Sequence, residues 1–271
     1  MKNVDLHHGA ASDVGLVRKV NEDSFLVAPP VFVVADGMGG HSGGDVASQM
    51  VVEEFQRLAE HYDPSRGAEQ VADTFARAQA RIVAYGNAHR ALSPGWHAGT
   101  TAVVAVLVDD NGVTKWLLAN LGDSRIYRIT EGRLEQISVD HSVVQELIDS
   151  GQITVAEAAV HPERHVITRA LGSPEGIDPD FFLLPLASVE RLLLCSDGVT
   201  GMIEDEEIET ILESVPDPRD AADALVAAAV AAGGRDNATA VVVDVVGLVK
   251  DASYDSQRQL ESLESKLGGR Q

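Results

Sequence analysis

The sequence contains a single cysteine and has no feature of an exported or membrane-bound protein. Because Cys195 has no second cysteine to pair with, an internal disulfide is excluded, and a reducing compartment is compatible with the chain. The amino terminus lacks the apolar stretch of a signal peptide, and the longest uncharged apolar segment, residues 225–234, is too short to span a bilayer. We therefore expect a soluble, cytoplasmic protein with no membrane partner.

Basic residues are also scarce. The chain has 21 Lys and Arg side chains against 42 Asp and Glu, which gives a formal net charge of −21. Such a charge repels nucleic acid and anionic membranes, so neither is expected as a partner. Histidine and cysteine are absent at the spacings typical of zinc ligands, since there is no His-Glu-x-x-His and no Cys-x-x-Cys. A zinc site is therefore disfavoured.

The apolar patterns predict an α+β protein built in layers. Strand-like runs lie at residues 24–27, 31–34, 101–108, 113–121, 125–130, 181–184, 191–195 and 238–246. Helical patterns cover residues 44–62, 68–90, 142–150, 154–159, 205–214 and 220–232. Asn111-Gly112 and Glu131-Gly132 are hairpin signals, so the middle of the chain should be antiparallel. Blocks of antiparallel strands with helices between them favour α+β layers over a doubly wound parallel sheet.

Two stretches interrupt this pattern. Residues 142–168 are polar and have only short helical patterns, and His141, His161 and His165 lie in or near them. This segment is either a mobile insertion or an ordinary helix-loop connection. The stretch after residue 248 is polar and weakly amphipathic. We expect a catalytic domain over residues 1–248, with an insertion near 142–168, followed by a tail or the start of a linker at 249–271.

Four aspartates stand at or next to the ends of apolar runs, each beside a small or turn-forming residue. They are Asp36, Asp123, Asp197 and Asp236. Carboxylates gathered at the rim of one sheet repel one another by several kcal/mol at protein-like dielectric unless cations lie between them. The pattern therefore predicts a divalent-metal centre.

Asp36-Gly37 presents a carboxylate and a main-chain carbonyl together, and such hard oxygen ligands suit Mg²⁺ or Mn²⁺. Alone, Asp-Gly is a common turn. Asn21-Glu22-Asp23 upstream and Asp197 and Asp236 downstream add further carboxylates. One bridging aspartate with several flanking carboxylates would hold two ions about 3.5–4 Å apart, the spacing at which a shared water becomes a nucleophile.

Six ordered motifs resemble those of the protein phosphatase 2C family, the metal-dependent serine/threonine phosphatases, in its bacterial form. They are Arg18-x-x-Asn21-Glu22-Asp23, residues 34–41 (VADGMGGH), Gly99-Thr100-Thr101, Gly122-Asp123-Ser124-Arg125, Ser196-Asp197-Gly198 and Gly234-x-Asp236-Asn237-x-Thr239. Each motif is weak alone, but six in order over residues 8–246 are specific.

The resemblance implies a four-layer αββα sandwich, in which a central antiparallel β-sandwich is flanked by paired helices, with a dinuclear Mn²⁺ or Mg²⁺ site at one end. It also implies metal-site roles for particular residues. Asp36 would bridge both ions, Asp197 and Asp236 would complete the first, Glu22 and the Gly37 carbonyl would serve the second, Asp23 would order their waters, and Asp123 with Asp197 would hold a third, weaker ion.

Substrate roles follow in the same way. Arg18 is a natural bidentate ligand for a phosphomonoester dianion, which needs a fixed cation near so acidic a chain. His41 would protonate the leaving oxygen as a general acid. His161 matches a histidine in the flap segment of bacterial members, where it would meet substrate.

We expect a cytoplasmic phosphatase that hydrolyses phosphoserine and phosphothreonine proteins by direct attack of a metal-bridging hydroxide, with no phosphoenzyme. It would act as a monomer, with a serine/threonine kinase as a possible partner by family association. A cysteine-based phosphatase is disfavoured, because Gly201 stands where the arginine after Cys195 is needed.

Two alternatives stay open. One is a serine esterase that uses Ser42 in Gly40-His41-Ser42-Gly43-Gly44, a Gly-x-Ser-x-Gly pattern between a strand and a helix. The other is a pseudophosphatase that binds phosphoproteins without turnover.

Overall fold

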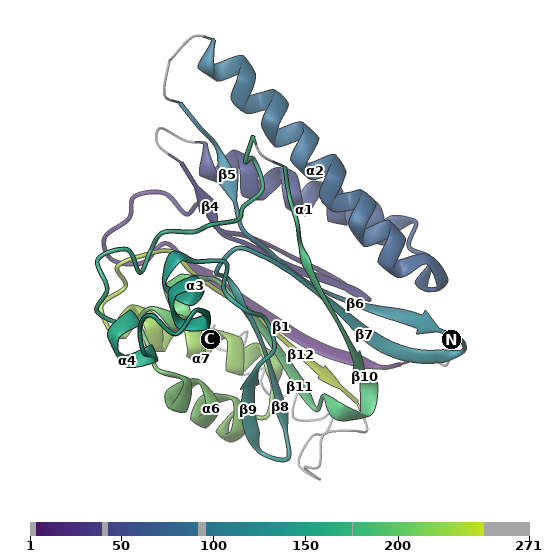
Figure 1. Ribbon diagram of the computed structural model, residues 1–271. Helices are drawn as coiled ribbons and strands as arrows, with labels where there is room; N and C mark the ends of the chain where they lie inside the picture. Colours follow the sequence, from purple (N-terminus) through teal and green to yellow (C-terminus); the bar gives the residue numbers. More distant parts are fainter. Residues whose placement is uncertain (1–3, 40–42, 92–95, 175, 247–271) are drawn as a thin grey trace, which may run out of the picture.

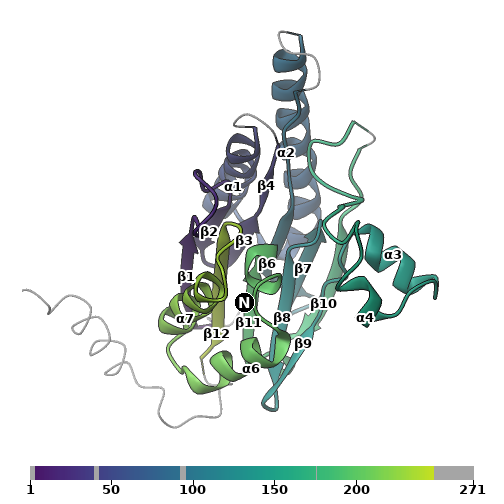
Figure 2. The ribbon, with the colours of Figure 1, turned by 90° about the vertical axis from the view of Figure 1, so that its left-hand side faces the viewer.

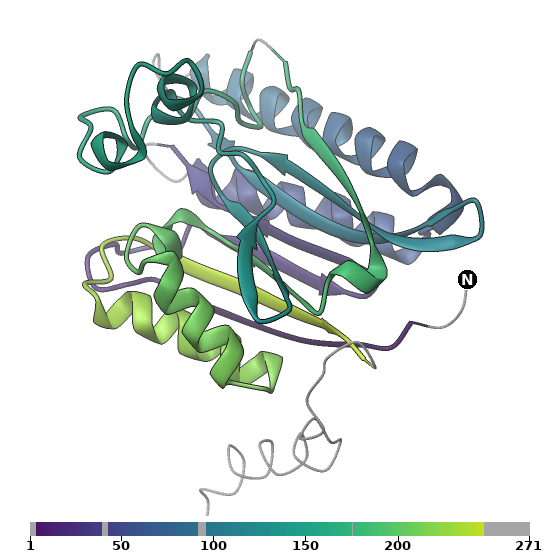
Figure 3. The same ribbon diagram turned by 60° about the horizontal axis from the view of Figure 1, so that its bottom comes forward.

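Two five-stranded antiparallel sheets form the centre of the protein, with helices on both outer faces (Figures 1 and 3). The structure is a computed structural model and describes residues 4–39, 43–91, 96–174 and 176–246. One sheet has the order β1-β12-β11-β8-β9 and the other β10-β7-β6-β3-β2. Every strand pairing within the two sheets is antiparallel. The predicted α+β sandwich is confirmed.

The strands are β1 (Leu6–Asp13), β2 (Ser24–Ala28), β3 (Val31–Ala35), β4 (Gly37–Met38), β5 (Gly99–Thr100), β6 (Ala102–Asp110), β7 (Val113–Leu121), β8 (Arg125–Thr130), β9 (Arg133–Gln136), β10 (Asp180–Pro185), β11 (Arg191–Cys195) and β12 (Ala238–Val245). The helices are α1 (Gly44–Glu60), α2 (Gly67–Arg90), α3 (Val143–Asp149), α4 (Val155–Ala158), α5 (Asp197–Thr200), α6 (Asp205–Ser214) and α7 (Pro218–Ala231), with short 3₁₀ turns at Pro64–Arg66 and Leu186–Ser188.

Three apolar layers separate the four layers of structure. One lies between α1, α2 and the sheet that contains β3 and β6, one between the two sheets, and one between the other sheet and α5, α6 and α7. Strand β3 shows why its sequence is a continuous apolar run: Val31, Val33 and Ala35 face the helices, whereas Phe32 and Val34 face the opposite sheet. Because both faces of the central strands are buried, alternation with polar residues is lost.

The hairpins follow the turn chemistry of the sequence. Asp110 pairs with Val113 and Thr130 with Arg133, so each connection has two residues. Asn111 and Glu131 have positive φ angles, as do the glycines that follow them. This is the left-handed conformation that tight hairpins require, and it confirms the antiparallel middle of the chain.

The sequence patterns did not predict strands β1, β4 and β5 or helix α5. Strand β1 pairs with β12 along its whole length, although its sequence, LHHGAASD, carries little strand signal. Helix α5 is a single turn that begins at Asp197. Helix α7 begins at Pro218, two residues before its predicted start, because the Asp217 side chain caps it by accepting the Arg219 amide.

The segment 142–168 holds α3 and α4 and lies at one end of the sandwich, away from the β6–β7 hairpin (Figures 1 and 3). Its ends meet: Val143 N donates to Val166 O at 2.9 Å, and Ser142 pairs with Ile167. That the segment acts as a mobile insertion stays a prediction. The predicted tail, 249–271, lies outside the described residues.

None of the described helices combines the length and the apolar character needed to cross a bilayer. Figure 2 shows the same layers from the side, with α1 and α2 behind one sheet and α6 and α7 beside the other.

A buried ion pair links the end of α6 to the sheet that contains β11 and β12. The Arg191 guanidinium donates to both oxygens of Asp244 across β11 and β12, at 2.7 and 2.8 Å. The same guanidinium donates to the carbonyls of Leu212, Val215 and Pro216 at and after the end of α6. Burial raises the pKa of Asp244, and the bonds and charge of Arg191 oppose that rise.

We expect Arg191→Ala to lower the free energy of unfolding by about 3–5 kcal/mol, because it leaves the Asp244 carboxylate buried without its partner. Arg66→Ala is the matched control, since it breaks a solvent-exposed pair with Glu69 and should leave the urea midpoint almost unchanged. Equal midpoints for the two variants in urea unfolding would show that the buried pair contributes nothing.

Candidate functional site

The four aspartates singled out in the sequence follow or precede strands of both sheets. Asp36 follows β3 and Asp123 follows β7, in one sheet, whereas Asp197 follows β11 and Asp236 precedes β12, in the other. They therefore approach one another from the facing sheets, at one end of the sandwich.

Three of these side chains, Asp36, Asp123 and Asp197, are half-buried and lie beside one another and beside Asp23, which is buried. The pKa of Asp36 is raised well above its ordinary value, first by burial and then by the charges of Asp23, Asp197 and Asp123 and by its hydrogen bond with Asp197. Burial is also the main cause that raises the pKa of Asp197. Such neighbours disfavour the charged form of a carboxyl group, and a bound cation would favour it.

Asp123 and Asp23 show the same effect. Burial, followed by the charges of Asp197 and Asp140, raises the pKa of Asp123 to about 7. Burial raises the pKa of Asp23 to about 6, against hydrogen bonds from Ser196 and Thr239. Oδ1 of each of these two side chains is buried and has no hydrogen-bond partner. Unpartnered buried oxygens in a cluster of like charges are what a hard divalent cation, or water bound to it, would satisfy.

The main chain around Asp36 is held closely in place. Thr101 N and Thr100 Oγ1 donate to the Asp36 carbonyl at 2.9 and 2.8 Å, and Thr101 Oγ1 accepts the Asp36 amide at 3.0 Å. A Cβ on Gly37 would lie 2.4 Å from the Glu22 carbonyl oxygen, so only glycine allows residue 22 to approach. The Gly37 carbonyl therefore belongs to a backbone whose position is fixed.

Asn237 was part of a sequence motif but had no predicted role. Its Nδ2 donates to the carbonyls of Val14 and Val20, and its Oδ1 accepts the Glu22 amide at 2.8 Å. The side chain thus holds the loop with Arg18 and Glu22 against the turn that carries Asp236. The pattern Asp-Asn after a glycine was the available signal, but it does not show which distant loop the amide would bind.

Glu22 and Asp236 lie at the more exposed rim of the cluster. Burial is the main cause that raises the pKa of Glu22, followed by the charge of Asp45. Asp236 Oδ2 accepts a 2.6 Å hydrogen bond from the Arg18 guanidinium, with side chains 36 % and 51 % exposed. Arg18 is thus brought to the site as predicted, but it binds Asp236.

Within the described parts of the chain, no three His, Cys, Asp or Glu side chains already form a set that could hold one ion. Asp23, Asp36, Asp123 and Asp197 are neighbours, whereas Asp236 is engaged with Arg18. Arg18 therefore competes with a cation for this carboxylate.

The structure describes one of the two predicted histidines, His161, and shows no contact between it and these carboxylates. His161 is partly exposed, and its Nδ1 accepts the amide of Glu163 at 3.1 Å. His41 lies outside the described residues, as does Ser42 of the Gly-x-Ser-x-Gly pattern. The esterase alternative is therefore not tested by the geometry.

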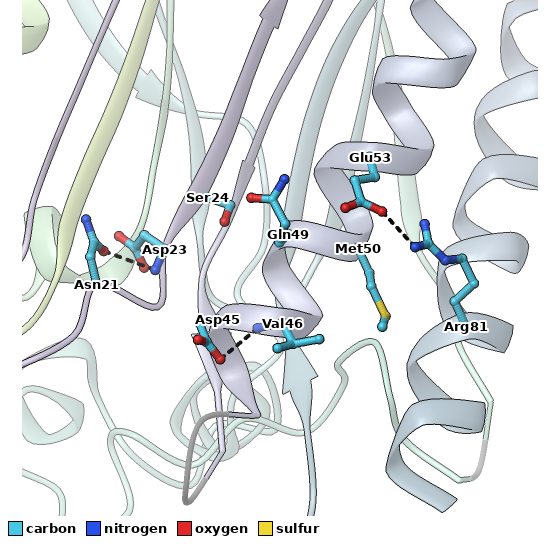
Figure 4. Close-up of a pocket in the computed structure, with 9 residues that line it drawn as sticks. All are labelled: Asn21, Asp23, Ser24, Asp45, Val46, Gln49, Met50, Glu53 and Arg81. Atoms are coloured by element: carbon cyan, nitrogen blue, oxygen red, sulfur yellow. Dashed lines mark hydrogen bonds and ion pairs between the residues drawn. The ribbon is translucent and has the colours of Figure 1, made fainter. Parts of the chain in front are cut away.

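A pocket of about 460 Å³ opens beside Asp23, between the loop before β2 and helix α1 (Figure 4). It is lined by Asn21, Asp23, Ser24, Asp45, Val46, Gln49, Met50, Glu53 and Arg81. Arg81 closes one side through its ion pair with Glu53, at 2.7 Å. The pocket extends the acidic character of the carboxylate cluster to the surface.

Comparison with known proteins agrees with this architecture. The family model of protein phosphatase 2C matches residues 18–239. The serine/threonine phosphatase stp of Listeria welshimeri is 35% identical over 249 residues, which cover 88% of this chain and 96% of that protein. The serine/threonine protein phosphatase PstP of Mycobacterium tuberculosis is 39% identical over 243 residues, which cover 89% of this chain but only 45% of that protein.

Solved structures agree as well. The crystal structure of the M. tuberculosis serine/threonine phosphatase PstP/Ppp matches with a TM-score of 0.79 and 35% identity, over 89% of this chain and 98% of that chain. A structure of the PstP catalytic domain in complex with two manganese ions matches with a TM-score of 0.75 and 34% identity, over 89% and 98% of the two chains. The chain described here therefore belongs to the protein phosphatase 2C family.

Proposed function

We propose that this chain hydrolyses phosphoserine and phosphothreonine in proteins with the help of two Mn²⁺ or Mg²⁺ ions held around Asp36, without a phosphoenzyme. Family membership makes it a metal-dependent serine/threonine protein phosphatase. The observation that carries the finer proposal is the group of crowded carboxyl groups, Asp23, Asp36, Asp123 and Asp197, whose mutual repulsion a pair of cations would relieve.

We assign the ligands by the sequence motifs. Asp36 would bind both ions, Asp197 and Asp236 would bind the first, and Glu22 and the Gly37 carbonyl would bind the second. Asp23 would order their water molecules, and Asp123 with Asp197 would hold a third, weaker ion. When bound, the ions supply an activated water as nucleophile and neutralise charge on the phosphate. The fit of these residues is supported by the unpartnered Oδ1 atoms of Asp23 and Asp123.

Arg18 binds the substrate phosphate in this proposal. A cation bound at Asp236 would compete with Arg18 for this carboxylate, and the freed guanidinium donors would be available for two phosphate oxygens. The guanidinium then orients the phosphomonoester and offsets its negative charge in a chain of net charge −21. The assignments of His41 as the proton donor and of His161 as a substrate contact rest on the sequence motifs alone.

We further propose that the enzyme acts in the cytoplasm as a monomer on proteins phosphorylated by a serine/threonine kinase. A buried, unpaired Cys195 is compatible with a reducing compartment, and the acidic charge disfavours nucleic acid. The pseudophosphatase alternative is disfavoured because none of the proposed carboxylate ligands is missing from the chain.

Asp36→Ala should reduce hydrolysis of an aryl phosphate by about a thousandfold or more, because it removes the carboxylate placed between the ions, which contribute several kcal/mol to the transition state. Asp236→Asn should have a similar effect. Asp73→Asn, an exposed change in α2, is the control for charge alone. Retention of substantial Mn²⁺-dependent turnover by Asp36→Ala, with circular dichroism unchanged, counts against the proposed site.

Metal removal should make stability depend on pH in a defined direction. The folded-state pKa values of about 7 for Asp123 and about 6 for Asp23 lie above the value of about 4 expected for an unfolded aspartate. Between these values the folded protein binds more protons than the unfolded chain, so stability rises as the pH falls from about 7 toward 4. In EDTA, the urea midpoint should therefore be higher at pH 5.5 than at pH 8.

Mn²⁺ should stabilise the protein more at pH 8 than at pH 5.5, because protons compete for its ligands. Asp123→Asn should flatten the pH dependence in EDTA, whereas Asp73→Asn should not. A metal-free protein that is equally stable at both pH values would contradict the clustering of charged carboxylates.

Arg18→Ala should raise KM for an aryl phosphate by about tenfold, because a charged hydrogen-bond partner of the phosphate is lost. Mn²⁺ affinity should not fall, since the same change removes the competitor for Asp236. Isothermal titration with Mn²⁺ and steady-state kinetics separate the two effects. An unchanged KM would remove Arg18 from the phosphate site.

A further inference from the structure

His141 is a buried side chain that the proposed mechanism does not use, and it contacts the turn that carries Asp123. The Gly122 amide donates to His141 Nδ1 at 3.1 Å, in a buried environment. A nitrogen that accepts this bond carries no hydrogen, so in the neutral ring the hydrogen is on Nε2. Nε2 lies 3.1 Å from Asp180 Oδ2 and donates to it. The Asp180 carboxylate thus favours the tautomer in which His141 Nδ1 can accept the hydrogen bond from the Gly122 amide.

The main chain of His141 binds on both of its sides. His141 N donates to the Gly122 carbonyl at 2.9 Å, so residue 122 is held at its amide and its carbonyl by the same residue. On the other side, Thr168 N donates to the His141 carbonyl at 2.8 Å. His141 therefore joins the Asp123 turn to both ends of the segment 142–168.

The conformation of the Gly122–Asp123 turn is restricted by its neighbours. Gly122 has a φ of +116°, and a Cβ there would lie 2.5 Å from Thr101 Cγ2. Ser124 Oγ and Thr101 Oγ1 share a 2.7 Å hydrogen bond, and Thr101 also binds the main chain of Asp36. Asp123 thus stands between two fixed points, and its Oδ1 is buried without a hydrogen-bond partner.

Arg169 extends this set of contacts through Asp180. Asp180 begins β10, next to Asn120 of β7, and its Oδ1 lies 3.5 Å from an Arg169 guanidinium nitrogen. Arg169 follows the segment 142–168 directly. The order of contacts is therefore Arg169, Asp180, His141, Gly122, with Asp123 as the next residue along the chain.

We propose that His141 is a positioning residue that fixes the Gly122–Asp123 turn for cation binding and couples it to the base of the segment 142–168. The part that concerns a cation rests on the proposed role of Asp123 in holding the third, weaker ion. His141 contacts the main chain of Gly122 directly. Loss of His141 therefore changes the position of the adjacent Asp123 carboxylate.

The test compares three substitutions of His141 that keep a polar atom near Nδ1, near Nε2 or at neither position. In His141→Asn, the amide oxygen takes the place of Nδ1 and can still accept Gly122 N–H. His141→Gln places its amide near Nε2, and His141→Ala removes both positions. His61→Gln, at an exposed histidine after α1, is the control.

The first readout needs no metal. In EDTA, hydrogen exchange at the Gly122 amide should be at least about tenfold faster in His141→Ala and His141→Gln than in the unchanged protein, while His141→Asn retains most of the protection. Thermal midpoints identify global destabilisation. If His141→Ala does not fold, Asp180→Ala at a partly exposed site is measured, and faster exchange at Gly122 is again expected. Equal protection of Gly122 in the variants that lose the acceptor overturns the proposal.

The second readout is Mn²⁺ binding followed by electron paramagnetic resonance. His141→Ala should weaken the weakest class of Mn²⁺ site about as much as Asp123→Asn, and the double variant should show no further loss, with His141→Asn restoring affinity. Additive losses would mean that His141 acts elsewhere. If Asp123→Asn leaves Mn²⁺ binding unchanged, the third-ion part of the proposed function fails, and the exchange of Gly122 alone decides the positioning role.

Discussion

Repulsion between crowded carboxylates is the constraint around which this end of the protein is organised. Asp23, Asp36, Asp123 and Asp197 each have a raised pKa, and burial is the largest cause in every case. A fold gains nothing in stability from such a cluster when it is empty of cations, because each added charge disfavours the others. The cluster is therefore explained by what it binds, and the surrounding structure by the need to hold it together.

Three sets of polar contacts within the sandwich hold these carboxylates in place. Threonine side chains at the end of β5 and directly after it fix the main chain of Asp36, the Asn237 amide holds the loop with Arg18 and Glu22, and His141 holds the turn before Asp123. Two glycines allow the close contacts: a Cβ on Gly37 would meet the Glu22 carbonyl, and one on Gly198 would lie 1.7 Å from the Asn237 carbonyl. Functional side chains from both sheets thus depend on polar bonds between loops that are distant in sequence.

The sequence predicted much of this because local chemistry determines it. Asn111-Gly112 specifies a tight hairpin, and apolar runs such as residues 31–35 specify strands buried on both faces. Strand β1 could not be predicted in this way, because its small and polar residues become a strand only through pairing with β12 and contact with α7, where Gly9 approaches Arg219. The positions of the four aspartates were readable, but the pairing of Arg18 with Asp236 was not, since it joins residues 218 apart through side chains alone.

The most direct measurement is an anomalous-scattering map from crystals grown with Mn²⁺. The account predicts two strong peaks about 3.5–4 Å apart with the Asp36 carboxylate between them, and an Asp236 side chain that has left Arg18 for one of the ions. A map without a peak at Asp36, or with Asp236 still bound to Arg18 in the presence of saturating Mn²⁺, would contradict it.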